Sequence, residues 1–229
     1  MRSVGEPAAV SDVTARARIR DAAVRRFGID GFGAPVRAIA ADAGVSPGLV
    51  IHHFGSKDAL RAVCDEHVLR VLREAKTESL VTAAPADMIT QLATVDHYAP
   101  LVGYLMQALF AGGELATAFL DRLIEDAEDY LRAAVDAGRI RPSRDPAART
   151  RFLAHAGVGA LLVHLRLHPP TGGDYRATLR AYLDRNALPM LELYTEGLFT
   201  DSGMLDAYVA AGPHPPHPPH PPDPPDPAG

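Results

Sequence analysis

Apolar residues recur every three or four positions along most of this chain, the spacing that lines one face of an α-helix. Val, Ile, Thr, Tyr and Phe nowhere gather into the alternating runs that a half-buried strand requires, whereas Ala, Leu and Arg, which favour helices, dominate. With 229 residues, 47% of them hydrophobic, the chain is long enough to fill one large core or two small ones. The sequence therefore predicts an all-α protein and argues against a parallel sheet.

Two features bear on the cellular compartment. Residues 1–13 carry one Arg and no apolar run of the length that a secretion signal needs, and no later stretch reaches about 18 uninterrupted apolar residues. The single cysteine, Cys64, excludes an internal disulfide, and its position on an apolar helical stripe predicts a buried thiol rather than a nucleophile. We expect a cytoplasmic protein.

The charge of the chain is unevenly distributed. The whole chain carries a net charge of −5, which by itself argues against binding to nucleic acid. Residues 14–57, however, have a surplus of four positive charges: Arg16, Arg18, Arg20, Arg25, Arg26, Arg37 and Lys57 against Asp21, Asp30 and Asp42. An anionic body with one cationic end is compatible with docking of that end on phosphates.

Two helices are predicted before Gly44. Thr14 can cap the first helix, which ends at the glycines of residues 28–33 and has an inner face of Ile19, Ala22, Ala23 and Phe27. Pro35 stands where a second helix of about two turns begins, and Gly44 is suited to end it.

Two further helices follow that glycine turn. Ser46 is a good N-cap and Pro47 a good first residue for a helix that ends at Gly55. Ser56 caps the next helix, whose long apolar stripe consists of Leu60, Val63, Cys64, His67, Val68, Val71 and Leu72. This stripe predicts a connecting helix.

The rest of the chain, to about residue 198, reads as further amphipathic helices. They are broken at Pro100, Gly112, Gly138, Pro142, Pro169 and the Gly172 and Gly173 pair. Residues 152–167 are apolar nearly all round and must be covered on more than one side, plausibly by a second subunit. Residues 175–194 place apolar side chains on one face, and Pro189 should kink or split that helix.

The tail from Gly212 onward is Pro-rich, lacks apolar periodicity and is predicted to be disordered. His214, His217, His220, Asp223 and Asp226 recur every third residue, which places them along one edge of a polyproline II helix. Neighbours on that edge are roughly 9 Å apart, too far for two imidazoles to share one ion at bonds of about 2.1 Å. We predict a solvated tail without a metal site.

Two segments of the predicted N-terminal region resemble one known family. Residues 39–49 read IAADAGVSPGL and residues 52–60 read HHFGSKDAL. Together with Phe27 and the Gly31 and Phe32 pair they resemble the tetracycline-repressor family of bacterial regulators over residues 19–60. The resemblance implies a DNA-binding transcriptional regulator, a repressor that a small-molecule effector releases from double-stranded operator DNA, and neither an enzyme nor a cofactor protein.

The resemblance also implies an organisation. A helix-turn-helix head over residues 14–58 follows a disordered arm over 1–13, and a helical ligand-binding domain over 59–211 forms a homodimer through its last two long helices before the tail at 212–229. The residues themselves also predict this helix-turn-helix, independently of the resemblance. A two-turn helix, a glycine turn and a Ser-capped helix are what helix-turn-helix geometry requires.

The family pattern implies roles for single residues. Arg37 and Lys57 would contact phosphates, and the residues facing the major groove would be Ser46, Pro47, Gly48 and His52. His53, also assigned to the DNA-binding site, would with Phe54 brace the helices more than read bases. Two positions depart from the family: Ile51 replaces an aromatic residue that meets the DNA backbone, and Pro35 replaces the usual Ser or Thr.

The effector site is less defined. Candidate pocket residues lie on helices that such folds use to enclose a ligand: Tyr98, Tyr104, Met106, Phe110, Phe119, Phe152, His155 and His164. The alternative for each of them is an ordinary core residue that does not contact a ligand. A helical scaffold without DNA binding stays an alternative, as does an enzyme using His97, His155 or His164, although no catalytic motif supports the latter.

Overall fold

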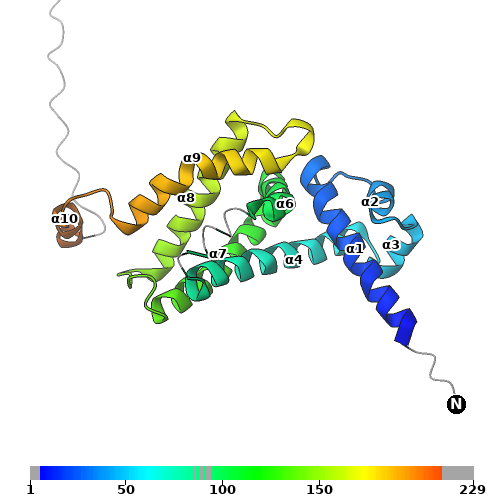
Figure 1. Cartoon of the computed structure of the whole chain (residues 1–229), viewed down its shortest axis with the longest axis horizontal. Coiled ribbons are helices and arrows are strands. Elements are labelled where there is room, and N and C mark those ends of the chain that lie inside the picture. The colour runs from blue at the N-terminus through cyan, green and yellow to red at the C-terminus, as the bar shows by residue number, and fades with distance from the viewer. Residues whose placement is uncertain (1–5, 85, 88–89, 91–93, 213–229) are drawn as a thin grey trace, which may run out of the picture. The chain divides into compact units, whose positions relative to one another are not determined.

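The computed structural model describes residues 6–84, 86–87, 90 and 94–212. Within these ranges every regular element is helical and no strand is present, which confirms the all-α prediction (Figure 1). The long helices are α1 (Glu6–Asp30), α2 (Val36–Ala43), α3 (Pro47–Phe54), α4 (Lys57–Thr77), α6 (Ala99–Phe110), α7 (Gly113–Asp136), α8 (Pro146–Leu167), α9 (Tyr175–Thr195) and α10 (Gly203–Ala211). Short helical turns are η1 (Glu78–Thr82), η2 (Val95–Tyr98) and η3 (Thr171–Gly173).

None of these helices, over the described residues, has the length and apolarity that a membrane crossing demands.

The chain divides into two compact units, Met1–Asp184 and Arg185–Gly229. The buried hydrophobic core belongs to the first unit, where α1, α2, α3, α4, α6, α7, α8 and the start of α9 all contribute. Over residues 185–212 no residue is buried. The second unit, as far as it is described, therefore has no core of its own.

The first helix starts earlier than its sequence pattern predicts. We expected a disordered arm over residues 1–13 and a cap at Thr14, but α1 begins at Glu6. Pro7 in the first turn, followed by Ala8 and Ala9, is compatible with a helix start, because Pro is tolerated there and Ala is the best helix former. The predicted disordered tail lies outside the described residues, apart from Gly212.

Helices α2 and α3 and the turn between them form as predicted. Pro35 is the N-cap of α2, and Gly44 ends it in the left-handed region, with a φ of 65°. The Ser46 hydroxyl accepts a hydrogen bond of 3.2 Å from the Leu49 backbone N–H and so caps α3. Because the glycine turn and the serine cap fix where each helix stops and starts, α2 and α3 form a helix-turn-helix.

Helices α1 and α6 cross at two glycines. A Cβ atom on Gly28 would lie 3.0 Å from the Tyr104 backbone nitrogen and 3.3 Å from the Pro100 carbonyl oxygen. On α6, a Cβ atom on Gly103 would lie 2.9 Å from the Tyr175 ring. At Gly28 the two backbones thus approach so closely that a Cβ atom would force its neighbours to shift. Figure 1 shows α2 and α3 on the opposite side of α1 from α6, so α1 joins the helix-turn-helix to the larger helical body.

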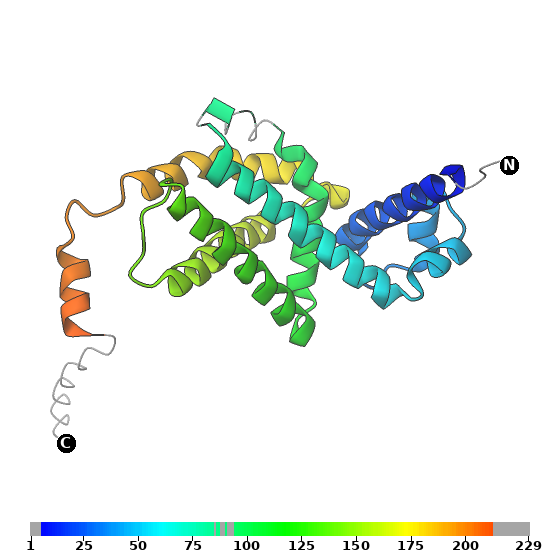
Figure 2. The same cartoon turned by 90° about the horizontal axis from the view of Figure 1, so that it is seen from below.

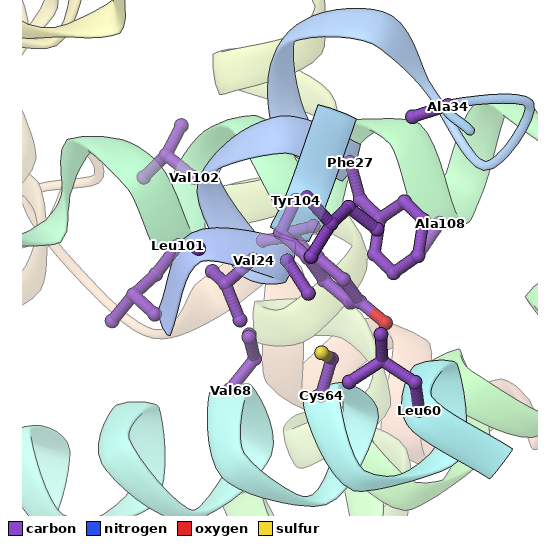
Figure 3. Close-up of a cluster of buried hydrophobic side chains, with 14 of the residues drawn as sticks. Val24, Phe27, Ala34, Leu60, Cys64, Val68, Leu101, Val102, Tyr104 and Ala108 are labelled. Carbon is purple, nitrogen blue, oxygen red and sulfur yellow. The ribbon is translucent and has the colours of Figure 1, made fainter. Parts of the chain in front are cut away.

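Helix α4 provides the second connection. Figure 2 shows it running from the helix-turn-helix into the body, where it crosses α7. Of its predicted apolar stripe, Leu60, Cys64 and Val68 are buried and the other four residues are half-buried; Leu69, outside that stripe, is buried as well. In Figure 3 the side chains of α1, α4 and α6 form one cluster, and the Tyr104 hydroxyl points towards α4.

Helix α9 does not split at its proline. Pro189 lies inside the continuous helix Tyr175–Thr195, so the expected split is absent. Proline removes one backbone hydrogen bond and costs about 3 kcal/mol in a helix interior. Ala187, Leu188, Met190 and Leu191 around it are helix formers, which favours continuation of the helix.

The crossing of α1 and α6 yields a stability prediction. We expect Gly28→Ala to lower the free energy of unfolding by about 1 to 3 kcal/mol, because the new methyl group meets backbone atoms that cannot move independently. Gly33→Ala is the matched control, since a Cβ atom there has no neighbour within 4 Å. Urea denaturation measures both variants. Equal stability of the two would contradict close packing at Gly28.

Candidate DNA interface

The outward face of α3 consists of residues one helical turn apart. Pro47, Gly48, Ile51 and His52 are exposed, whereas Val50 and Phe54 on the opposite face are buried. Ser46 is also exposed, and its hydroxyl serves as the cap of the helix. The structure therefore brings together the four residues predicted to face the major groove and adds Ile51 to them.

His53 occupies a different environment from His52. Its side chain is only 5% exposed, and its ring packs edge-on against His52 and Phe54 at centroid distances of 5.7 and 6.2 Å. Its Nε2 atom lies 3.5 Å from a carboxylate oxygen of Asp12 on α1, an ion pair when the imidazole is protonated. These contacts suit a residue that braces α3 against α1.

The acidic side chains of residues 14–57 are all engaged by arginines. Arg20 pairs with Asp21 at 2.7 Å, and Arg26 pairs with Asp42 at 2.7 Å and with Asp30 at 3.1 Å. The hydrogen bonds from Arg26 hold the pKa of Asp42 below its usual range. The three carboxylates of residues 14–57 are thus already paired with arginines.

The other cations of this region are available to an external anion. Arg18, Arg25, Arg37 and Lys57 form no ion pair within the described residues, and the Arg16 guanidinium lies 5.0 Å from the Phe54 ring centroid. Arg37 is exposed in the first turn of α2, and Lys57 is the first residue of α4. A positively charged side chain at a helix N-terminus is well suited to bind a phosphate, because the free backbone N–H groups add to its charge.

The eight candidate pocket residues do not form one site. Tyr104, Met106, Phe119 and His164 are buried and Tyr98 is half-buried, whereas the exposed residues are Phe110, Phe152 and His155. Only Tyr104 and Phe119 are brought into ring contact, at a centroid distance of 6.4 Å. Their assignment to an effector pocket stays a prediction.

A groove that the sequence pattern did not indicate opens between α4 and α7. Its volume is about 390 Å³, and its lining residues are Glu66, Leu69, Arg70, Arg73, Arg122, Glu125 and Asp126. Ion pairs of Arg70 with Glu74 at 2.9 Å and of Arg73 with Asp126 at 3.2 Å cross or border it. None of the eight candidates lines this groove, which is charged rather than apolar.

A buried polar contact between α4 and α6 also escaped the sequence analysis. The Tyr104 hydroxyl donates a hydrogen bond of 2.6 Å to a carboxylate oxygen of Asp65. Burial raises the pKa of both groups, and the nearby carboxylate raises the pKa of Tyr104 further. Cys64 is buried, as predicted, and burial raises the pKa of its thiol to about 12.

An aromatic cluster covers this contact. The Phe32 ring lies 5.4 Å from the rings of both Phe27 and Tyr104, and the Arg61 guanidinium stacks 3.6 Å from the Phe32 ring centroid. The cluster joins α1 and the loop after it to α4 and α6. Sequence periodicity marks such residues as buried but does not show which helices they join.

A capped helix-turn-helix with an exposed second helix, flanked by unpaired cations and joined to a helical body, defines a helix-turn-helix DNA-binding regulator. Comparison with known families identifies which one. The model for bacterial regulatory proteins of the tetR family matches residues 19–64, and that for the tetracyclin repressor-like C-terminal domain matches residues 96–200. The chain belongs to the tetracycline-repressor family, whose members are transcriptional regulators and not enzymes.

Individual relatives agree with this assignment. The chain is 49% identical over 201 residues to the HTH-type transcriptional regulatory protein RaaS of Mycobacterium tuberculosis, covering 87% of this chain and 94% of that protein. A solved protein provisionally named a TetR-family transcriptional regulator, from Rhodococcus sp., shares the fold with a TM-score of 0.52 at 22% identity, over 75% of this chain and 97% of its own. A solved Clostridium perfringens protein provisionally named a fatty acid metabolism regulator also shares the fold. Its TM-score is 0.55 at 18% identity, and the match covers 80% of this chain and 100% of that protein.

The unpaired cations lead to a prediction about salt. We expect Lys57→Ala to weaken binding to all DNA sequences about equally and to reduce the slope of log affinity against log salt by about 1, because one phosphate contact is lost. Arg132→Ala, which removes an exposed charge from α7, is the control and should leave the slope unchanged. Fluorescence anisotropy across a salt series measures both. A Lys57→Ala variant with altered sequence preference and an intact slope would refute the phosphate role.

Proposed function

We propose that this regulator is a cytoplasmic, dimeric repressor that leaves its operator when a small molecule binds its helical body. The observation that carries the DNA-binding part is the exposed face of α3 beside cations that have no acidic partner within the described residues. Phosphates held by Arg37 and Lys57 would set the position of the head, here meaning α1 to α3. Ser46, Pro47, Gly48 and His52 would then meet base edges, with His53 as a brace.

The dimer would form through α8 and α9. On α8, Phe152 is 69% exposed and Leu167 70% exposed, and on α9 Leu188 is 75% exposed. Further exposed apolar side chains on these helices are Val163, Met190, Leu193 and Tyr194. Exposed apolar side chains are costly in water, and in a symmetric dimer the same residues of a second copy would cover them. Such a dimer would read a palindromic operator.

Effector release would act through α6. Tyr104 and Met106 are fully buried on α6, so a ligand that enters beside them must displace this helix. Because α6 packs against α1 at Gly28, a displaced α6 would move the head. The Tyr104 hydrogen bond to Asp65 would transmit the same motion to α4. A change in the separation of the two heads would weaken both half-site contacts together, at a coupling free energy of about 1 to 3 kcal/mol.

The proposed interface can be tested by light scattering. We expect the full chain, 24.4 kDa as a monomer, to have twice that mass at micromolar concentration. Val163→Glu should shift it towards monomer, because a charge would be buried in the interface. Leu115→Glu, on an equally exposed position of α7, is the control and should stay dimeric. A monomeric parent chain would remove the interface and the expectation of a palindromic operator.

The thermodynamic linkage between ligand binding and operator binding tests the effector mechanism. Once thermal-shift screening of small, largely apolar compounds identifies a ligand, operator DNA should weaken its binding by the same factor by which the ligand weakens operator binding, about 5- to 150-fold. Calorimetry with and without operator measures this factor. Equal ligand affinity in both states would exclude the proposed release, and the buried residues of α6 would then be ordinary core.

A further inference from the structure

The exposed face of α3 offers very few groups that can hydrogen-bond to a base. Pro47, Gly48 and Ile51 carry no side-chain donor or acceptor, and the Ser46 hydroxyl at the helix start accepts from the Leu49 backbone N–H, which leaves its O–H to donate. His52 is the exception on this helix. The arginine, asparagine and glutamine side chains that most often read base edges are absent from α3. Sequence reading by this helix must therefore depend largely on apolar contact.

Ile51 is the large apolar group on that face. Its side chain is 44% exposed, although the neighbouring Val50 and Phe54 are buried in the core. An exposed isoleucine pressed against polar base edges would strip water from them without returning a hydrogen bond, which is unfavourable. The thymine C5-methyl group is the apolar feature that a base pair presents in the major groove, and covering it with Ile51 would be favourable.

Gly48 gives independent evidence that a surface approaches here. A Cβ atom on Gly48 would meet only the Ser46 hydroxyl, at 3.9 Å, and the backbone there does not have a positive φ. The fold itself therefore does not require glycine, which destabilises a helix by roughly 0.5 to 1 kcal/mol relative to alanine. Close approach of an external partner explains the glycine. Gly48 lies three residues before Ile51, on the same side of the helix.

We propose that Ile51 packs on a thymine C5-methyl group in each operator half-site, with the α3 backbone held against the groove at Gly48. The operator then carries a T·A pair at the base step facing Ile51. This inference rests on the proposed binding of operator DNA through α3. It assigns a specificity role to the position where this chain departs from the aromatic residue of the family pattern.

The test replaces thymine with deoxyuridine, which removes the methyl group and leaves every hydrogen-bonding group in place. An operator is first selected from random duplexes with the full-length protein, and each thymine is then replaced symmetrically in both half-sites. We expect one position to lose affinity about fourfold per half-site and about fifteenfold in the whole operator, the loss of one buried carbon group each. Ile51→Ala should abolish the difference between thymine and deoxyuridine at that position.

Two controls keep the outcomes separate. Leu115→Ala removes a still more exposed aliphatic side chain from α7 and should keep the full deoxyuridine effect. Thermal unfolding checks that Ile51→Ala is folded, and Ile51→Ser, which also removes both methyl groups of isoleucine, replaces it if it is not. A deoxyuridine effect that persists in the Ile51 variants, or no sensitive thymine in a selected operator, would overturn the inference while leaving DNA binding intact. Failure to select any operator would instead refute the proposed function.

Discussion

The close approach of α1 and α6 is the constraint on which the rest of the structure depends. Gly28 permits this approach, because a Cβ atom there would lie 3.0 Å from the Tyr104 backbone nitrogen, whereas a Cβ atom on Gly103 would instead press on the Tyr175 ring of α9. The approach places Tyr104 where its ring meets the Phe27 and Phe32 cluster and its hydroxyl reaches Asp65 on α4. One crossing thus fixes the head to both helices that could carry a signal from the body.

The same arrangement explains how the charges are divided. Arg26 is occupied by Asp42 and Asp30, which ties α1 to α2. Arg61 is occupied by the Phe32 ring within the junction. Arg26 and Arg61 therefore have structural roles, whereas Arg37 and Lys57, at the starts of α2 and α4, form no ion pair within the described residues, which supports the proposed contacts with phosphates. The surplus positive charge of residues 14–57 is thus carried by particular side chains, two of them at the starts of helices, rather than spread evenly along the chain.

Features fixed by local chemistry could be predicted from the sequence. Gly44, Ser46 and Ser56 end or start helices through backbone geometry and hydrogen bonds a few residues away, so the helix-turn-helix was foreseen. Features that depend on distant partners were not. The contact between Tyr104 and Asp65 joins residues that share no local pattern, so helical periodicity alone does not indicate it. Local preference also misplaced the start of α1, where Thr14 is an adequate cap that the longer helix does not use.

The central claim is that the head and the helical body, up to Asp184, form one cooperative unit through this junction. Native-state hydrogen exchange on the full chain and on Tyr104→Phe tests it most directly, because this change leaves the ring in place but removes the hydrogen bond to the half-buried Asp65 carboxylate. We predict that the free energy of opening falls by the same amount, about 1 to 3 kcal/mol, for the amides of α1, α4 and α6. A fall confined to α4 and α6, with α1 unchanged, would show that the head unfolds independently and would contradict the account.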